Sequence, residues 1–237
     1  MENSIKLSVG SQLYRDLKDK VNRKVFRRFH MPWMKSKEMD IIDEVLNKLK
    51  PKNCLEWGSG YSTLLFPGRL PELNVWHSIE HNKEWYELLK DQITNQKVTL
   101  TFVEPDNKNY NSAGPYNESS EGIYKDFETY INYPQRYNLK FDFVFIDGRS
   151  RKNCLRKAFE LLNDDGVIIV HDANRVDYFS ELPAFGSIFH LTDYRKDKLR
   201  GGIWVGAKKD INKYLDTDHH EALWKQHDRI AKALFLR

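Results

Sequence analysis

The fold of this chain is decided by the stretch Cys54-Leu55-Glu56-Trp57-Gly58-Ser59-Gly60-Tyr61-Ser62-Thr63. The apolar run from Cys54 to Trp57 predicts a short buried strand that ends in a Gly-x-Gly turn. The residues from Thr63 to Leu65 predict a helix directly afterwards. Glycines let the backbone turn tightly and approach a ligand, and a helix N-terminus offers free N–H groups. Strand, glycine turn and helix in this order are typical of a nucleotide-binding α/β sheet.

Strands and helices alternate on both sides of this stretch. Upstream, residues 1–50 predict helix, and a set of apolar residues at helical spacing should pack against the sheet: Ile41, Ile42, Val45, Leu46 and Leu49. Downstream, strands are expected over residues 75–80, 98–103, 141–146 and 166–170, and helices over 83–89 and 156–162. Each crossover is long enough for a helix, which predicts parallel strands. Residues 187–192 and 202–206 predict an antiparallel hairpin, because residues 197–201 connect them closely.

These elements predict three parts: an N-terminal helical extension (1–50), a sheet core (51–210) and a C-terminal amphipathic helix (211–237). The polar segment 104–121, which contains Gly114, Pro115 and Tyr116, is expected to form a loop or lid. A helix should follow it with Ile123, Phe127, Tyr130 and Ile131 on one face. The last helix, from His219, should face the core or a second copy in a homo-oligomer with one set of residues: Leu223, Trp224, Ile230, Ala231 and Leu234.

Composition narrows the class of protein. The 237 residues are 40% hydrophobic and 30% charged, which suits one soluble α/β domain with helical extensions. Two cysteines exclude a disulfide framework and favour a cytoplasmic location, and we expect neither a signal peptide nor a membrane span. Residues 1–52 carry thirteen Lys+Arg against seven Asp+Glu, densest at Arg23, Lys24, Arg27 and Arg28. This basic run is a solvated helix face, or it contacts an acidic glycan or the anionic inner face of a membrane.

The glycine turn lies among residues suited to a nucleoside. Glu80 ends the second predicted strand, where a carboxylate accepts the hydroxyls of a ribose; the alternative is an exposed strand end. Thr63 replaces the third glycine of a dinucleotide motif, and Gly-Lys-Ser/Thr is absent. Glu56 would repel a pyrophosphate but attract the ammonium and sulfonium of S-adenosylmethionine. The predicted cofactor-binding residues are Glu56, Gly58, Ser59, Gly60, Ser62, Thr63, Glu80, His81 and Asp147.

Chemistry-bearing residues gather where the fourth and fifth predicted strands end. Asp147, with Arg149 and Arg151 close behind, follows one strand, and His171 and Asp172 follow the other. A carboxylate or histidine there can remove the proton of an acceptor hydroxyl. Alternatively, Asp147 and Asp172, with Asn174 or His171, would hold Mg²⁺ or Mn²⁺. The alternative interpretations are that Asp147 caps a helix, that His171 serves packing and that the arginines form surface ion pairs.

The motifs Glu56-x-Gly58-x-Gly60, Glu80 and the closing hairpin resemble class I S-adenosylmethionine-dependent methyltransferases over roughly residues 50–210. The resemblance implies a Rossmann-like seven-stranded, mostly parallel sheet with an antiparallel last strand and helices on both faces. It also implies that Glu56 and Gly58 lie near the methionine part of the cofactor and Glu80 on its ribose.

The run Ile146-Asp-Gly-Arg-x-Arg-x-x-Cys154, with Asp165-Gly-Val-Ile-Ile-Val-His-Asp172, resembles a bacterial branch associated with glycan biosynthesis. It is similar, more distantly, to glucuronoxylan 4-O-methyltransferases. Metal-dependent macrolide sugar O-methyltransferases carry two adjacent acids where this chain has His171-Asp172, and a histidine base where it has Ser150.

These observations predict an O-methyltransferase acting on a sugar hydroxyl of a polysaccharide or glycan, with Asp147, His171, Asp172 and Arg151 as catalytic candidates. Tyr116 is a candidate for stacking on a sugar ring, whereas Trp33 should pack in the core. The alternatives are methylation of a catechol or antibiotic sugar, an NAD(P)-dependent oxidoreductase, and a non-catalytic subunit. Nucleic-acid substrates are disfavoured, because no Asn/Asp-Pro-Pro-Tyr/Phe run occurs and neither cysteine follows a proline.

Overall fold

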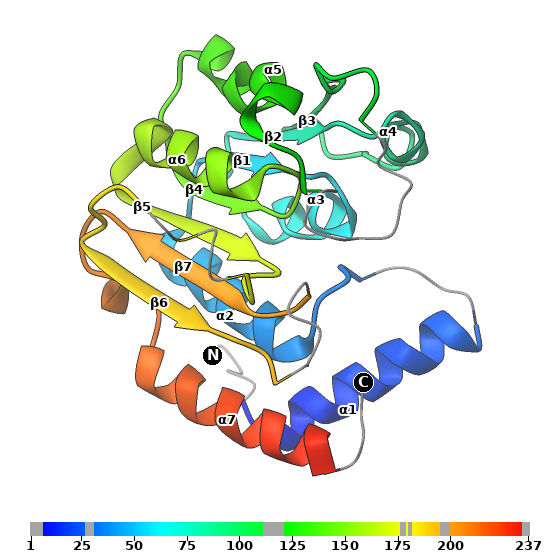
Figure 1. Cartoon of the computed structure of the whole chain (residues 1–237). Coiled ribbons are helices and arrows are strands. Elements are labelled where there is room, and N and C mark those ends of the chain that lie inside the picture. Colours follow the sequence, from blue (N-terminus) through cyan, green and yellow to red (C-terminus); the bar gives the residue numbers. More distant parts are fainter. Residues whose placement is uncertain are drawn as a thin grey trace.

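The computed structural model describes residues 7–26, 31–110, 121–175, 179, 182–194 and 200–233. Its centre is a seven-stranded sheet in the order β3-β2-β1-β4-β5-β7-β6 (Figure 1). The strands are β1 (Asn53–Trp57), β2 (Val75–Glu80), β3 (Val98–Phe102), β4 (Phe141–Ile146), β5 (Leu162–His171), β6 (Ser187–Leu191) and β7 (Ile203–Ala207). Strands β1 to β5 pair in parallel, and β7 runs antiparallel between β5 and β6. The predicted fold class is confirmed.

Helices cover both faces of the sheet, as Figure 1 shows. The α-helices are α1 (Val9–Lys24), α2 (Ser36–Leu49), α3 (Tyr61–Leu65), α4 (Lys83–Lys90), α5 (Glu128–Asn132), α6 (Arg151–Leu161) and α7 (Thr217–Ala233). Short 3₁₀ turns lie at Pro67–Arg69, Tyr124–Asp126, Tyr133–Tyr137 and Ile211–Lys213. No helix in the described part of the chain is long and apolar enough to cross a membrane.

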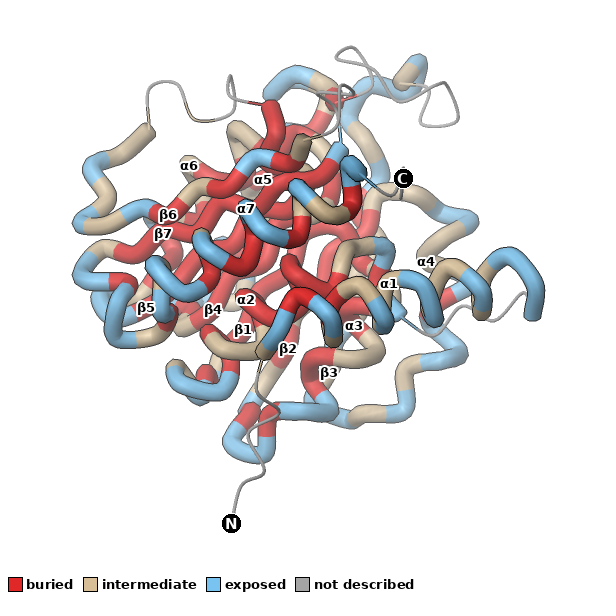
Figure 2. The backbone as a smooth tube through the Cα atoms, turned by 90° about the horizontal axis from the view of Figure 1, so that it is seen from below, coloured by how far each residue is buried: buried red, intermediate tan, exposed pale blue. Residues whose placement is uncertain are grey.

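The apolar residues of the sheet alternate between two cores, because successive side chains of a strand point to opposite faces. Cys54 of β1 faces a core that α2, α3 and α7 complete, whereas Leu55 and Trp57 face a second core that α5 and α6 complete. Figure 2 shows the buried strands running as a continuous band through the molecule. As predicted, α2 packs against the sheet: Ile41, Ile42, Val45 and Leu46 all belong to the first core.

The predicted helix over residues 1–50 is in fact two helices. Helix α1 ends at Lys24, α2 begins at Ser36, and residues 31–35 between them are not helical. Pro32 lies in this break; a proline lacks an N–H group and disfavours helix in the residue before it. The third predicted helix face also differs, because Ile123 is 65% exposed whereas Phe127, Tyr130 and Ile131 are buried.

Other elements begin a few residues away from their predicted bounds. Helix α6 begins at Arg151 rather than Arg156, and β5 begins at Leu162 rather than Gly166. In α7, Leu223, Trp224 and Ala231 are buried as predicted, while Ile230 is only half-buried. Several expectations fall outside the described residues: those for the basic residues Arg27 and Arg28, for Gly114, Pro115 and Tyr116 of the polar loop, for 197–199 of the hairpin connection, and for Leu234.

Candidate active site

The glycine turn after β1 is locked against the loop that follows β4. Gly58 has a φ of 90°, and its N–H donates to the carbonyl of Ile79 at 2.9 Å. A Cβ atom added to Gly58 would lie 2.4 Å from Cα of Gly148, closer than real contacts allow. The positive φ and the close approach of the two backbones both require glycine here.

Glu56 lies beneath this turn and is fully buried. Its carboxylate accepts four hydrogen bonds, from Ser62 Oγ (2.5 Å), Thr63 Oγ1 (2.6 Å), Trp76 Nε1 (2.9 Å) and Ser78 Oγ (2.7 Å). Burial raises the pKa of Glu56, and these hydrogen bonds oppose the rise. The acceptor positions of Glu56 are filled by α3 and β2, and neither Glu56 nor Thr63, both predicted to bind the cofactor, lines the cavity described next.

A cavity of about 690 Å³ opens above the glycine turn. It is lined by most of the predicted cofactor residues: Gly58, Ser59, Gly60, Ser62, Glu80, His81 and Asp147. Tyr61, Trp85 and Leu88 add an apolar wall, with the two rings edge to face at 6.1 Å. The volume is within the usual range of a small-molecule site. We call this space the donor cavity.

Glu80 and His81 form the far side of the donor cavity. Glu80 is 3% exposed, so it is not an exposed strand end; it accepts hydrogen bonds from the backbone N–H groups of Ser59 (2.9 Å), His81 (2.9 Å) and Asn82 (2.7 Å). These three bonds leave acceptor capacity on a carboxylate that has about four lone-pair positions. His81 Nδ1 lies 3.0 Å from Oε1 of Glu80, while the buried Nε2 makes no hydrogen bond to the described residues.

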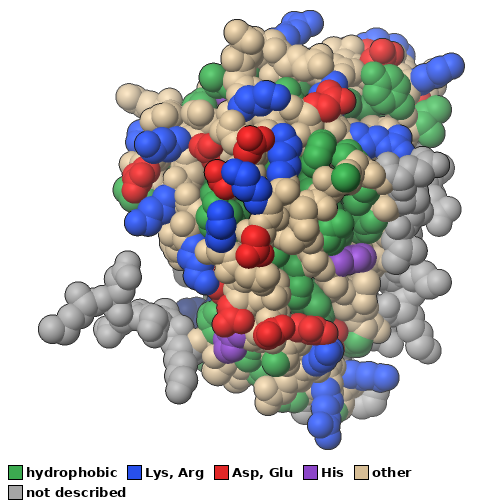
Figure 3. Space-filling model, turned by 90° about the vertical axis from the view of Figure 1, so that its left-hand side faces the viewer, with side chains coloured by type: hydrophobic (Ala, Val, Ile, Leu, Met, Phe, Trp, Pro, Cys, Tyr) green, Lys and Arg blue, Asp and Glu red, His purple; other side chains and the backbone are tan. Residues whose placement is uncertain are grey.

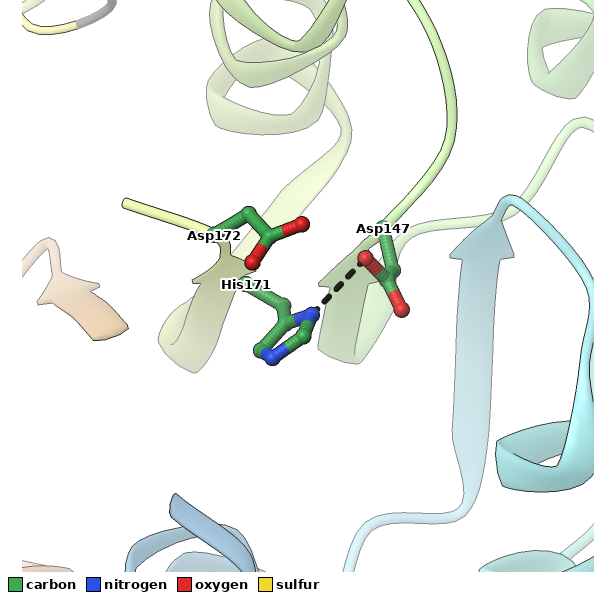
Figure 4. A group of neighbouring side chains, drawn as sticks. All are labelled: Asp147, His171 and Asp172. Carbon is green, nitrogen blue, oxygen red and sulfur yellow. Dashed lines mark hydrogen bonds and ion pairs between the residues drawn. The ribbon is translucent and has the colours of Figure 1, made fainter. Parts of the chain in front are cut away.

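Asp147, His171 and Asp172 meet at the ends of β4 and β5, as predicted (Figure 4). His171 Nδ1 lies 2.9 Å from Asp147 Oδ1, and His171 Nε2 lies 3.5 Å from Glu38 Oε2 on α2. Burial lowers the pKa of His171, but Asp147 and Asp172 outweigh it and raise the pKa well above its ordinary value. The raised pKa favours the imidazolium form of His171, which lies between the carboxylates of Asp147 and Glu38.

Asp147 is bonded to neighbours rather than capping α6. Arg151 Nη2 lies 3.1 Å from its Oδ1, and the N-cap position of α6 is Ser150. Burial alone would raise the pKa of Asp147, but His171 and Arg151 outweigh it, so the pKa is lowered. Asp147 is thus a carboxylate at neutral pH.

The same three residues have the composition of a metal site. One ligand atom each of Asp147, His171 and Asp172 lies within 4.8 Å of the others. Arg151 Nη2, however, lies between the acids, 3.1 Å from Asp147 and 3.8 Å from Asp172, and the raised pKa of His171 favours its imidazolium form. Asn174, the other expected ligand, has its amide bonded to Asp193 N and Arg200 O. Because side-chain cations already neutralise these acids, this arrangement does not fit the expected Mg²⁺ or Mn²⁺.

Two residues that the sequence did not single out hold Arg151 in place. Glu121 accepts hydrogen bonds from the backbone N–H (2.8 Å) and Nη1 (3.2 Å) of Arg151, and from Nη1 of Arg175 (2.8 Å). Glu121 and Arg175 are separated by more than fifty residues in sequence, so no local pattern could reveal the pair. Arg151 is consequently 3% exposed and fixed, rather than part of a surface ion pair.

A second cavity, of about 640 Å³, adjoins this group. It lies between α1, α2, α7 and the strand ends and is lined by Glu38, Arg151, His171, Asp172 and Arg200, among others. Three residues line both cavities: Trp33, Asp147 and Arg149. Trp33 is 70% exposed, so the expectation that it packs in the core is wrong. We call this second space the acceptor cavity.

The sheet order, the glycine turn after β1 and the acid at the end of β2 define the class: the fold is that of Rossmann-like class I methyltransferases. No family model and no curated protein matches the sequence. The chain is similar in structure to a proposed caffeoyl-CoA O-methyltransferase from Staphylococcus aureus (TM-score 0.53, 16% identity), over 84% of this chain and 99% of the other.

Two further solved structures share the fold. A proposed O-methyltransferase from Klebsiella pneumoniae has a TM-score of 0.51 at 15% identity, over 85% of this chain and 97% of its own. The spermidine synthase of Thermotoga maritima has a TM-score of 0.51 at 12% identity, over 85% and 74%. Because proteins with different reactions share this fold, the reaction must be argued from the site.

Proposed function

We propose that this chain is an S-adenosylmethionine-dependent O-methyltransferase. The observation that carries the proposal is that Asp147 lines both the donor and the acceptor cavity. A group transferred between ligands in the two cavities would pass beside its carboxylate. The donor cavity suits a nucleoside, since Glu80 is one of its walls and can accept ribose hydroxyls, and Thr63 in place of the third glycine of a dinucleotide motif disfavours a pyrophosphate.

S-adenosylmethionine, when bound, supplies an electrophilic methyl group on a sulfonium. The residues of the chain then orient the acceptor: Asp147 accepts a hydrogen bond from the acceptor hydroxyl, while His171 and Arg151 hold the carboxylate in place. A carboxylate of lowered pKa is a weak base. It suffices here because the hydroxyl becomes strongly acidic as its oxygen forms a third bond, to the methyl carbon, while the bond from that carbon to sulfur breaks, so Asp147 takes the proton late.

We infer a sugar hydroxyl as the acceptor. Trp33 offers an exposed aromatic face at the junction of the cavities, and aromatic rings are favourable platforms for the apolar faces of sugars. Arg149 and Arg200 line the acceptor cavity and suit hydroxyl or carboxylate groups of a glycan. A catechol or an antibiotic sugar is the alternative, and a panel of acceptors with labelled S-adenosylmethionine distinguishes them.

Calorimetry with S-adenosylhomocysteine, with and without Mn²⁺, tests the cofactor. We expect saturable one-to-one binding whose affinity Mn²⁺ does not change, because Arg151 occupies the position of a cation. Asp147→Asn should bind the cofactor nearly as the wild type does, yet lower turnover on a responding acceptor about 100-fold or more. Asp165→Asn, in an exposed side chain, is the matched control.

Absence of heat with S-adenosylhomocysteine would contradict the proposal, and binding of NAD(H) instead would favour an oxidoreductase. Full turnover by Asp147→Asn would remove Asp147 from its role. Tight cofactor binding with no turnover on any acceptor would favour a non-catalytic subunit.

A further inference from the structure

Exposed apolar side chains are concentrated in one region of the molecule. Twelve large hydrophobic residues are exposed in the described part of the chain, and seven of them lie between residues 14 and 33. They are Tyr14, Leu17, Val21, Val25, Phe26, Met31 and Trp33. Single exposed hydrophobic residues are ordinary on a protein surface, but a contiguous group indicates a surface that another body covers.

Helix α1 arranges four of these residues, with two lysines, on one side. At 3.6 residues per turn, Tyr14, Leu17, Lys18, Val21, Lys24 and Val25 fall within about a third of the helix circumference. All six are exposed. We call this set the α1 face. In Figure 1, α1 projects beyond the sheet, beside α7, and Figure 2 shows exposed positions recurring along it.

The opposite side of α1 packs against α2 and α7. The α1 face is therefore not the side by which this helix joins the protein core. Gln12 Nε2 and Arg15 Nη2 donate to Asp40 of α2 at 2.9 and 2.7 Å. Asp16 lies 3.0 Å from His227 of α7. These contacts fix the helix on the molecule and turn the α1 face outward.

The α1 face is also positively charged. It carries Lys18 and Lys24 and no acidic residue, because the two aspartates of the helix lie elsewhere on it: Asp16 meets His227, and Asp19 meets Arg23 at 2.6 Å. Figure 3 shows the side of the molecule away from α1, where acidic and basic side chains are interspersed. The α1 face thus combines an apolar stripe with two lysines and no acidic residue.

We propose that the α1 face docks this protein on an anionic lipid bilayer. An in-plane helix with apolar residues toward the acyl chains and lysines at the headgroup level is the known form of such contacts. Charge disfavours the other candidate, a second copy of the chain, since its α1 face would bring lysines against lysines. This proposal does not depend on the proposed reaction.

Docking in this way would place the acceptor cavity at the membrane. Leu17 of the α1 face and Trp33 both line that cavity. An acceptor held at the bilayer would therefore reach Asp147 without leaving the surface. The arrangement suits an acceptor with a lipid portion.

Co-sedimentation of the full chain with vesicles tests the proposal. We expect pelleting with phosphatidylcholine vesicles that contain phosphatidylglycerol, little with phosphatidylcholine alone, and partial release at raised salt. Lys18→Gln/Lys24→Gln should weaken partitioning about 30-fold, since each lysine near an anionic surface contributes about fivefold. Val21→Asp/Val25→Asp should abolish it.

Ile188→Asp, which changes an exposed apolar residue of β6, is the matched control and should bind vesicles as the wild type does. Calorimetry with S-adenosylhomocysteine and thermal melts establish that each variant is folded. The proposal is overturned if the wild type does not pellet, or if all variants pellet equally. It is also overturned if sedimentation velocity shows a dimer that Val21→Asp/Val25→Asp dissociates while no form binds vesicles.

Discussion

At the scale of single residues, Glu56 shows that a sequence can indicate an acid beside the glycine turn without indicating which face of the sheet its side chain points to. The sequence places an acid at the end of β1 beside a glycine turn, which suggests a cofactor ligand. Side chains alternate along a strand, however, and Glu56 shares the face of Cys54, toward α2 and α3. Its four hydrogen bonds instead fix the start of α3 to the middle of β2, so it supports the glycine turn from beneath.

Glu56→Gln tests this role. An amide replaces one of the two carboxylate oxygens by an NH2 group, which then faces a donor instead of accepting from it, so we expect a loss of about 1–3 kcal/mol in the free energy of unfolding in urea. S-adenosylhomocysteine affinity should fall in the same variant, because the turn loses its support. Glu72→Gln, at an exposed position, is the control. Unchanged stability with lost cofactor binding would show that Glu56 contacts the cofactor after all.

At the scale of elements, α1 is held to α7 by a charged pair. Burial lowers the pKa of His227, but hydrogen bonds with Asp16 and Asp228 outweigh it, so the pKa is raised. Burial raises the pKa of Asp16, but hydrogen bonds from His227 and Ser36 outweigh it, so the pKa is lowered. The pair is therefore an imidazolium and a carboxylate over a window of pH, and it stabilises the docking of α1 within that window.

The sign of the pH dependence follows from the two shifts. A raised histidine pKa gives stability that is complete below the unfolded value of about 6.5 and is lost as the pH rises through the folded value. A lowered aspartate pKa gives stability that is complete above about pH 3.9 and is lost as the pH falls through the folded value. The ion pair between Asp16 and His227 should therefore contribute its full stabilisation between roughly pH 4 and 6.5.

Asp16→Asn should accordingly destabilise the protein by about 1.5 kcal/mol at pH 6, and by clearly less at pH 8.5. Urea unfolding at both values measures the difference. Asp19→Asn on the same helix breaks a more exposed pair, and we expect a loss of under about 1 kcal/mol with little pH dependence. Equal effects of Asp16→Asn at both pH values would be inconsistent with an ionised pair.

Much of the fold could be predicted because apolar residues recur at regular intervals along these strands and helices. The strands β1 to β5, the closing hairpin and the packing of α2 all follow from apolar spacing. The break before α2 could have been inferred from Pro32, whose effect on the preceding residue is local. The contact of Glu38 with His171 could not, because it joins α2 to the end of β5 across more than 130 residues.

At the scale of the whole molecule, the predicted three-part division does not describe how the core is shared. Ile41, Ile42, Val45 and Leu46 of α2 are at most 2% exposed and lie in the same core as Phe143, Val167 and Trp224. Burying four such side chains contributes roughly 6–12 kcal/mol. The entire stability of a typical domain is about 5–15 kcal/mol.

A chain that begins at Pro51 should therefore not fold. We expect low solubility, no cooperative thermal transition and no binding of S-adenosylhomocysteine. Removal of residues 1–6 alone, which precede α1, is the control and should leave a cooperative transition. A soluble, cooperatively melting protein from residues 51–237 would show that the first fifty residues are a separable extension.

The contact of Gly58 with Gly148 joins the glycine turn to the loop that carries Asp147. Gly58 lines the donor cavity, and Gly148 directly follows Asp147, which lines both cavities. Two backbones this close cannot shift independently. A displacement of the glycine turn therefore also displaces the residue beside Asp147, which couples the two cavities mechanically.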